Sequence, residues 1–161
     1  MIRRWPIWVA TMGGLGYLPA PGTFGSLPGI LLMWALWCFS PNTYAFLPAV
    51  ILCLGFLWGI RVCRKAQELL DEKDPGKIVF DETIGMGISL LWLPLGWIQV
   101  ILSFILFRIF DIAKPFWIRR SENIYAKNPG VSVMLDDLLA GILANITVRI
   151  ILYVLIYYHW I

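Results

Sequence analysis

Apolar residues of this chain gather into long stretches that short polar connections separate. Five stretches have a length and composition typical of membrane segments: residues 24–40, 44–60, 78–93, 97–112 and 137–158. Only a helix satisfies the backbone hydrogen bonds of such a segment within the hydrocarbon of a bilayer. The pattern therefore predicts an all-α fold, a polytopic membrane helix bundle of about five segments that forms a single domain over residues 1–161. Several stretches are close to the minimum of about 17 residues for a span, so we expect tilted helices or a locally thinned bilayer.

Two further segments accompany this pattern. Residues 5–18 are apolar, but they are short and interrupted by glycine, which favours an interfacial or re-entrant position. Residues 61–77 are polar, and their charges fall at helical spacing, as between Arg64 and Glu68. We therefore expect residues 61–77 to extend the second membrane helix into the cytosol and to end at Pro75-Gly76.

The composition indicates that lipid is the natural solvent of the chain. Hydrophobic residues make up 60% of the sequence and charged residues only 14%, whereas about a quarter of the residues of a soluble domain are charged. A chain of this size cannot bury so much apolar surface inside a globule. Cys38, Cys53 and Cys63 form no C-x-x-C pair, so we expect them to act as small buried apolar residues and not as disulfide or zinc-site residues.

Charged residues are distributed asymmetrically between the two sides of the predicted bundle. The connections at residues 41–43 and 94–96 and the end at residues 159–161 contain no Lys, Arg, Asp or Glu. Every basic residue except Arg149 falls on the other side, which the positive-inside rule assigns to the cytoplasm. We expect a cytoplasmic N-terminus, an extracytoplasmic C-terminus and an Arg149 side chain that extends outward to the membrane surface.

Acidic residues are concentrated at three helix ends on the predicted cytoplasmic side. Asp81 and Glu82 open the third segment, Asp136 and Asp137 open the last one, and Asp111 lies near the end of the fourth. Charges in membrane helices are unfavourable, and adjacent carboxylates repel each other unless a cation neutralises them. A helix dipole or a salt-bridged helix end explains a single acid well and two adjacent acids less well. We therefore expect the five carboxylates to converge.

Positive charge and a glycine-rich segment accompany these acids. Arg108, Asp111 and Lys114 follow one another at three-residue spacing, which places them on one stripe of a helix. Residues 16–26 are rich in glycine and proline and precede the first span, so their backbone and the following helix N-terminus suit an anion such as phosphate. Taken alone, such a helix entry is also compatible with a purely structural role. The candidate phosphate-binding residues are Gly22, Thr23, Gly25 and Ser26, together with Arg108.

Hard oxygen ligands without histidine or cysteine suit Mg²⁺, and Mg²⁺ with carboxylates and phosphate is typical of phosphoryl transfer. As a hypothesis, the carboxylates hold Mg²⁺ and position a water for in-line attack, while Arg108 and Lys114 neutralise phosphate oxygens. Which carboxylate acts as the base, or whether one is a covalent nucleophile, stays open. The expected metal ligands are Asp81, Glu82, Asp111, Asp136 and Asp137, and these five residues with Lys114 are the candidate catalytic residues.

Four motifs follow one another along nearly the whole chain. They read G-x-L-P-A-P-G-T-x-G-S at residues 16–26, K-D-P-x-x-I-V-x-D-E-x-x-G at 73–85, F-R-x-F-D-I-x-K-P at 107–115 and V-M-x-D-D-x-x-A-G at 133–141. In this order they resemble the phosphatidylglycerophosphatase A family. The chain departs from the family pattern at residues 116–118 and 128–132, between the third and fourth motifs, which concerns head-group specificity more than metal chemistry.

This resemblance implies a phosphoric monoester hydrolase, a Mg²⁺-dependent lipid phosphatase that converts phosphatidylglycerophosphate to phosphatidylglycerol in phospholipid biosynthesis. It also implies a multi-pass protein of the bacterial inner (cytoplasmic) membrane with its active site facing the cytoplasm. The expected partners are the phospholipid substrate and the membrane. We expect no binding to nucleic acid. The sequence does not determine the oligomeric state.

Three alternatives compete with this function. A CDP-alcohol phosphotransferase also gathers aspartates and Mg²⁺ at a membrane surface, but its D-G-x2-A-R signature is absent. A magnesium-transporting membrane protein would carry acids at the middle of the membrane or on both faces, whereas these acids gather on one. The third alternative is a purely structural membrane subunit.

Overall fold

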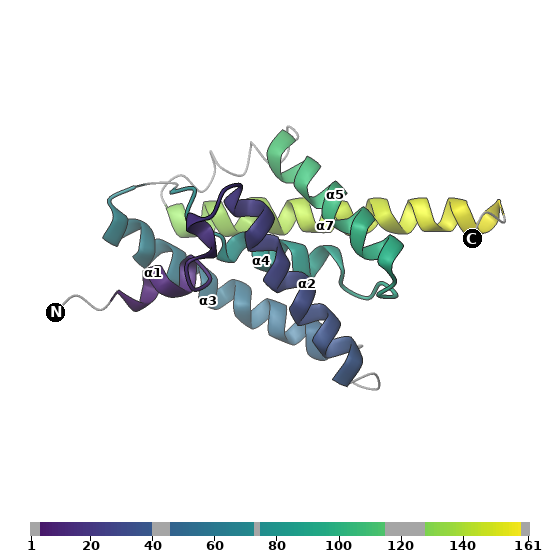
Figure 1. The fold of residues 1–161 in the computed structure, drawn as a ribbon, viewed down its shortest axis with the longest axis horizontal. Coiled ribbons are helices and arrows are strands. Elements are labelled where there is room, and N and C mark those ends of the chain that lie inside the picture. Colours follow the sequence, from purple (N-terminus) through teal and green to yellow (C-terminus); the bar gives the residue numbers. More distant parts are fainter. Residues whose placement is uncertain (1–3, 40–45, 73–74, 115–127, 159–161) are drawn as a thin grey trace.

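The computed structural model describes residues 4–39, 46–72, 75–114 and 128–158. Every regular element within these ranges is a helix, which confirms the predicted all-α fold (Figure 1). The elements are α1 (Trp5–Ala10), the short 3-10 helix η1 (Leu15–Tyr17), α2 (Pro21–Phe39), α3 (Leu47–Leu70), α4 (Phe80–Ser89), α5 (Trp97–Ala113) and α7 (Pro129–Tyr157).

Two helices in the described ranges, α3 and α7, are long and apolar enough to cross a membrane, as judged by length and composition. The prediction of five membrane segments is therefore not supported. Only 28% of the most apolar window of α3 and of α7 is buried inside the molecule. Most of the apolar surface of these two helices is thus left for a surrounding apolar medium or partner.

The largest difference from the predicted segments concerns residues 78–93, where the helix α4 has only 10 residues. A helix of this length is about 15 Å long, about half of the roughly 30 Å thickness of bilayer hydrocarbon. After α4 the chain turns, with Trp92 at a φ of 58°, and Pro94 follows. The apolar stretch therefore continues beyond the end of α4. Its apolar residues reflect burial inside the bundle and do not indicate the length of the helix.

Other helix ends also differ from the predicted bounds. α2 begins at Pro21, so the glycine-rich residues 22–26 form its first turns instead of preceding it. α7 begins at Pro129, eight residues before the predicted start at residue 137, and proline is favoured at the first helical positions. α3 continues to Leu70, which confirms that polar residues extend the second segment, but it ends at Asp71 in a left-handed conformation and not at Pro75-Gly76.

The short helix α4 lies at the centre of the bundle. It packs against α7, α2, α3 and α5, and all of its residues except Glu82 and Ile88 are buried. In Figure 1, α4 lies between the long helices α3 and α7, and the C-terminal part of α7 extends beyond the other helices. Residues at the N-terminal end of α4 are therefore enclosed by several helices.

Glycines allow α4 and α7 to approach each other closely. A Cβ atom on Gly141 would overlap the carbonyl oxygen of Gly85, and a Cβ atom on Gly85 would lie 2.7 Å from the carbonyl oxygen of Asp137. The two backbones thus meet without intervening side chains, which small residues at a helix crossing permit.

The three cysteines do not share one environment. Cys63 is buried, with its sulfur 3.9 Å from the sulfur of Met134, so the prediction of a packing role fits this residue. Cys38 and Cys53 are exposed, and the prediction of burial inside the molecule is wrong for both. They lie on α2 and α3, where large apolar side chains such as Leu31 and Leu54 are also exposed.

The crossing of α4 and α7 yields a stability prediction. We expect Gly141→Ala to destabilise the protein by about 1–3 kcal/mol, because the added methyl group would force the two backbones apart. The matched control is Gly76→Ala, since nothing lies within 4 Å of a Cβ atom on Gly76. Thermal unfolding of the purified proteins in detergent would measure the difference. Equal unfolding temperatures for the two variants would contradict the close crossing.

Candidate metal and phosphate site

The start of α4 is held in place by contacts from two other segments. The backbone N–H of Val79 donates to the carbonyl of Ala10 at 2.9 Å. The hydroxyl of Thr83 donates to the carbonyl of Gly25 on α2 at 2.6 Å. Asp81 and Glu82 occupy the first turn of α4, where the helix dipole favours negative charge. These contacts give both carboxylates a defined position.

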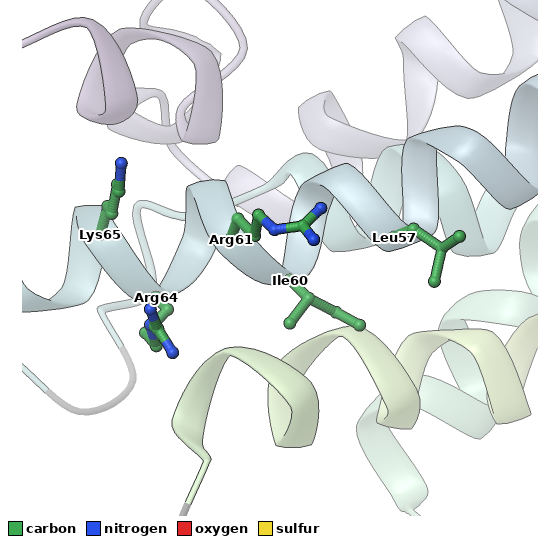
Figure 2. A pocket seen from close by; sticks show the side chains of 5 residues that line it. All are labelled: Leu57, Ile60, Arg61, Arg64 and Lys65. Carbon is green, nitrogen blue, oxygen red and sulfur yellow. The ribbon is translucent and has the colours of Figure 1, made fainter.

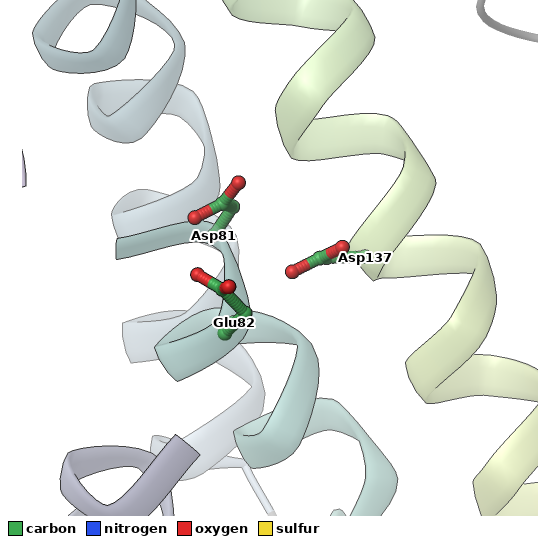
Figure 3. A group of neighbouring side chains, drawn as sticks. All are labelled: Asp81, Glu82 and Asp137. Carbon is green, nitrogen blue, oxygen red and sulfur yellow. The ribbon is translucent and has the colours of Figure 1, made fainter. Parts of the chain in front are cut away.

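Three carboxylates from two helices converge at this point. Asp81 and Glu82 on α4 face Asp137 on α7 (Figure 3), and one carboxylate oxygen of each lies within 4.8 Å of the others. Asp81 and Asp137 are only 7% and 5% exposed, and Glu82 is half-buried. We call these three residues the carboxylate triad.

The oxygens of the carboxylate triad include three that lack a partner within the described part of the chain. Asp81 Oδ1, Glu82 Oε2 and Asp137 Oδ2 are buried and accept no hydrogen bond there. Burying a charged group without a compensating interaction is strongly unfavourable, and three carboxylates in one place also repel one another. A cation with oxygen ligands would offset both effects. The donor set therefore fits a divalent metal ion.

Two ion pairs flank the carboxylate triad. On α5, the guanidinium of Arg108 donates to Asp111. At the end of α5, Lys114 adopts a φ of 38°, and its Nζ lies 3.2 Å from Oδ2 of the buried Asp136 on α7. Arg108 and Asp111 lie within electrostatic range of Glu82 in the carboxylate triad. Both cations are partly exposed, so each can contact an anion that enters from solvent.

The glycine-rich start of α2 contacts this site through Gly22. A Cβ atom on Gly22 would overlap the guanidinium of Arg108 in its present position, so a larger residue would require this flexible side chain to shift. Gly25 packs in the same way against Val79. The hydroxyl of Ser26 is buried and donates to the carbonyl of Gly22 at 2.7 Å, whereas Thr23 is exposed. The segment thus shapes the site by close packing, and phosphate binding by these four residues stays a prediction.

The structure brings together three of the five expected metal ligands as one group. Asp111 and Asp136 lie beside this group, each paired with a cation of α5. Their role as metal ligands stays a prediction, as do the catalytic roles of the five carboxylates and Lys114. Of the stretches that depart from the family pattern, residues 116–118 lie outside the described ranges.

Sequence reasoning missed a polar cluster at the other end of α4. Nδ2 of Asn145 lies 2.9 Å from the carbonyl oxygens of Ser89 and Leu91 and 3.3 Å from that of Ile88. Arg149 donates to the Asn145 side chain at 2.8 Å and to the carbonyl of Trp92 at 3.0 Å.

These bonds satisfy the carbonyl of Ser89 at the end of α4 and the carbonyls of Leu91 and Trp92 in the turn after it. The guanidinium of Arg149 is exposed and donates to the carbonyls of Leu91 and Trp92 in the turn after α4, and its extension to the membrane surface stays a prediction. An asparagine and an arginine four residues apart in the mainly apolar C-terminal part of α7 were the signal that could have indicated a capping role.

Comparisons with known proteins agree with the sequence motifs. Residues 8–152 match the family model described as phosphatidylglycerophosphatase A. The chain belongs to the phosphatidylglycerophosphatase A family. This membership confirms the predicted enzyme class, a phosphoric monoester hydrolase, and it decides against the transporter and structural-subunit alternatives.

Curated relatives of this family member cover most of its length. A Haemophilus influenzae protein named "Phosphatidylglycerophosphatase A" is 40% identical over 151 residues, which cover 92% of this chain and 90% of the relative. An Escherichia coli protein of the same name is 37% identical over 134 residues, or 81% of this chain and 74% of the relative. A Bacteroides thetaiotaomicron protein named "Putative phosphatidylinositol-3-phosphatase" is 38% identical over 151 residues, or 90% of this chain and 92% of the relative. No solved structure shows a significant match.

The cap of α4 yields a prediction for this family member. Asn145→Leu keeps the approximate size of the side chain but removes the amide that donates to the carbonyl of Ser89 and one donor each of the Ile88 and Leu91 carbonyls, so we expect a loss of about 1–3 kcal/mol in unfolding free energy. The control is Thr147→Val on the same helix, because the Thr147 hydroxyl donates to the carbonyl of Leu143 within its own helix at 2.7 Å. Denaturant or thermal unfolding in detergent would compare the two. An Asn145→Leu protein as stable as Thr147→Val would contradict the capping role.

Proposed function

We propose that this chain is a membrane-embedded, Mg²⁺-dependent phosphatase that hydrolyses the terminal phosphomonoester of phosphatidylglycerophosphate. The observation that carries the proposal is the carboxylate triad, which has buried oxygens without a partner in the described ranges and is flanked by the ion pairs of one arginine, Arg108, and one lysine, Lys114. The family and the two relatives named for this activity support the substrate. The products are phosphatidylglycerol and inorganic phosphate.

The charge balance of the site supports a metal-dependent reaction. Five carboxylates, Asp81, Glu82, Asp111, Asp136 and Asp137, stand against the two cations Arg108 and Lys114. A phosphomonoester is itself an anion, and it would be repelled from such a site without additional positive charge. Asp81, Glu82 and Asp137 would hold Mg²⁺, which would supply charge neutralisation and polarise a phosphate oxygen.

The protein's own side chains bind and orient the phosphate in this proposal. Arg108 and Lys114 contact phosphate oxygens while they stay close to their carboxylate partners. Gly22 leaves the space beside α2 that the guanidinium of Arg108 occupies. Hydrolysis forms a bond between a water oxygen and phosphorus and breaks the bond between phosphorus and the glycerol oxygen. One proton of the water passes to a carboxylate, which returns it to the leaving glycerol oxygen, and the other proton stays on the inorganic phosphate.

A membrane location is supported by the surface of the helices. Large apolar side chains are exposed along α3, α5 and α7, among them Leu54, Ile105 and Ile150. The polar end of α3 lies beside the start of α7, since Gly130 packs against the backbone of Ile60 and Arg64. We propose that α3 and α7 cross the bacterial inner membrane. The polar end of α3, the start of α7 and the active site would then lie on the cytoplasmic side.

A second candidate substrate is phosphatidylinositol 3-phosphate, because one relative carries a name for that activity. Purified protein in detergent would be offered phosphatidylglycerophosphate, phosphatidylinositol 3-phosphate and phosphatidic acid side by side, with Mg²⁺ or with EDTA. We expect phosphate release to be fastest from phosphatidylglycerophosphate and to stop in EDTA. Faster release from either other lipid would contradict the assigned substrate, and full activity in EDTA would contradict the metal.

Amide substitutions separate the carboxylate triad from ordinary surface acids. We expect Asp81→Asn and Asp137→Asn each to lower turnover by about two orders of magnitude or more, by analogy with other lost electrostatic contacts to a transition state. Glu68→Gln and Asp71→Asn are the controls, because both acids are exposed, and they should change turnover little. Near-normal turnover in both triad variants would show that the active site lies elsewhere.

A further inference from the structure

The outward face of α3 changes from apolar to cationic within one turn. α3 is apolar as far as Ile60, and Arg61, Arg64 and Lys65 then follow, all three exposed. In a helix that crosses a bilayer, such a change marks the level at which hydrocarbon meets the lipid head groups. The three cations would therefore lie beside the phosphates of the cytoplasmic leaflet.

This face of α3 is separate from the carboxylate triad. Val62, Cys63 and Ala66, which alternate with the cations along the helix, are buried and lie on the opposite side of α3. Cys63 contacts Met134 of α7 on that buried side. The cations on the outward face thus take no part in the proposed catalytic site.

The outward face forms a cavity of about 560 Å³. Figure 2 shows the side chains that line it, which are Leu57, Ile60, Arg61, Arg64 and Lys65. Aliphatic groups and cations thus border the same space, and a phospholipid offers the matching pair of an acyl chain and a phosphate. A second cavity, of about 490 Å³, has three acids in its lining, Glu68, Asp71 and Glu72, and is unsuited to an anion.

The cations of the outward face are only weakly engaged by the protein. Arg64 lies 3.6 Å from Glu68, but both side chains are more than half exposed, and ion pairs of this kind contribute little. Lys65 Nζ lies 5.9 Å from the centre of the Trp5 ring, which leaves its hydrogen-bond donors able to contact an anion. Arg61 forms no ion pair with any acid in the described ranges.

We propose that this outward face of α3 binds an anionic phospholipid as a second lipid, distinct from the substrate at the carboxylate triad. The head-group phosphate contacts Arg61 and Lys65, and an acyl chain lies along Leu57 and Ile60. Because the site requires α3 to lie in a membrane, it rests on the membrane location in the function proposed above.

Lipid binding to the full-length protein in neutral detergent would test this site, with native mass spectrometry to titrate phosphatidylserine against phosphatidylcholine. Phosphatidylserine is anionic but is neither the proposed substrate nor the product. We expect the wild type to prefer it, and the double variant Arg61→Gln/Lys65→Gln to bind it about 25-fold more weakly, roughly fivefold for each lost charge. The control Lys77→Gln removes a cation that pairs with Glu72 at 3.7 Å, away from this face, and should bind as the wild type does.

Three further variants or readouts keep this test decisive. The charge-preserving variant Arg61→Lys/Lys65→Arg should retain phosphatidylserine binding. The double variant Arg61→Gln/Lys65→Gln should keep phosphatase activity in mixed micelles of detergent and phosphatidylcholine, which would show that this variant is folded. Asp137→Asn should lose activity and still bind phosphatidylserine, so failure of the catalytic proposal and failure of the lipid site are separable. Equal affinity for the two lipids, wild-type affinity in the double variant, or loss of binding in Asp137→Asn would overturn the proposal.

Discussion

Where α4 crosses α7, the backbones of Gly85 and Gly141 meet with no side chain between them. This contact brings acids on two helices to one point, although their charges repel each other. Larger residues at either glycine would separate the helices and increase the distance between Asp137 and the start of α4. The site therefore depends on a packing interaction that holds like charges together, and the bonds of Thr83 and Asn145 hold the two ends of α4 at that crossing.

A buried group of like charges is stable only if something compensates it. Arg108 and Lys114 compensate Asp111 and Asp136 directly, but the carboxylate triad has no such partner within the described ranges. The uncompensated charge of the carboxylate triad is unfavourable in the absence of a cation, and it gives the site affinity for a divalent cation. With the cation bound, the site can accept an anionic phosphate. Packing, metal affinity and substrate binding are thus linked through the same three side chains.

Much of this site could be predicted from the sequence because its signals are local. Adjacent acids such as Asp136 and Asp137 at the start of an apolar helix are unusual wherever they occur, and small residues at Ala140-Gly141 indicate a close crossing. Helix lengths could not be predicted in the same way. Residues 83–93 contain no charged residue, yet the helix ends at Ser89, because Asn145 and Arg149 cap it from a distant part of the chain. The hydropathy of a segment does not reveal such a long-range contact at its end.

Direct metal binding tests most closely whether the carboxylate triad holds a divalent cation, because the measurement needs no substrate. Mn²⁺ prefers the same oxygen ligands as Mg²⁺, and its binding to the purified protein can be followed by electron paramagnetic resonance. We expect the wild type to bind Mn²⁺, Mg²⁺ to displace it, and a combined Asp81→Asn/Asp137→Asn variant to bind Mn²⁺ at least about tenfold more weakly. Unchanged Mn²⁺ affinity in that folded variant would contradict the carboxylate triad as the metal site.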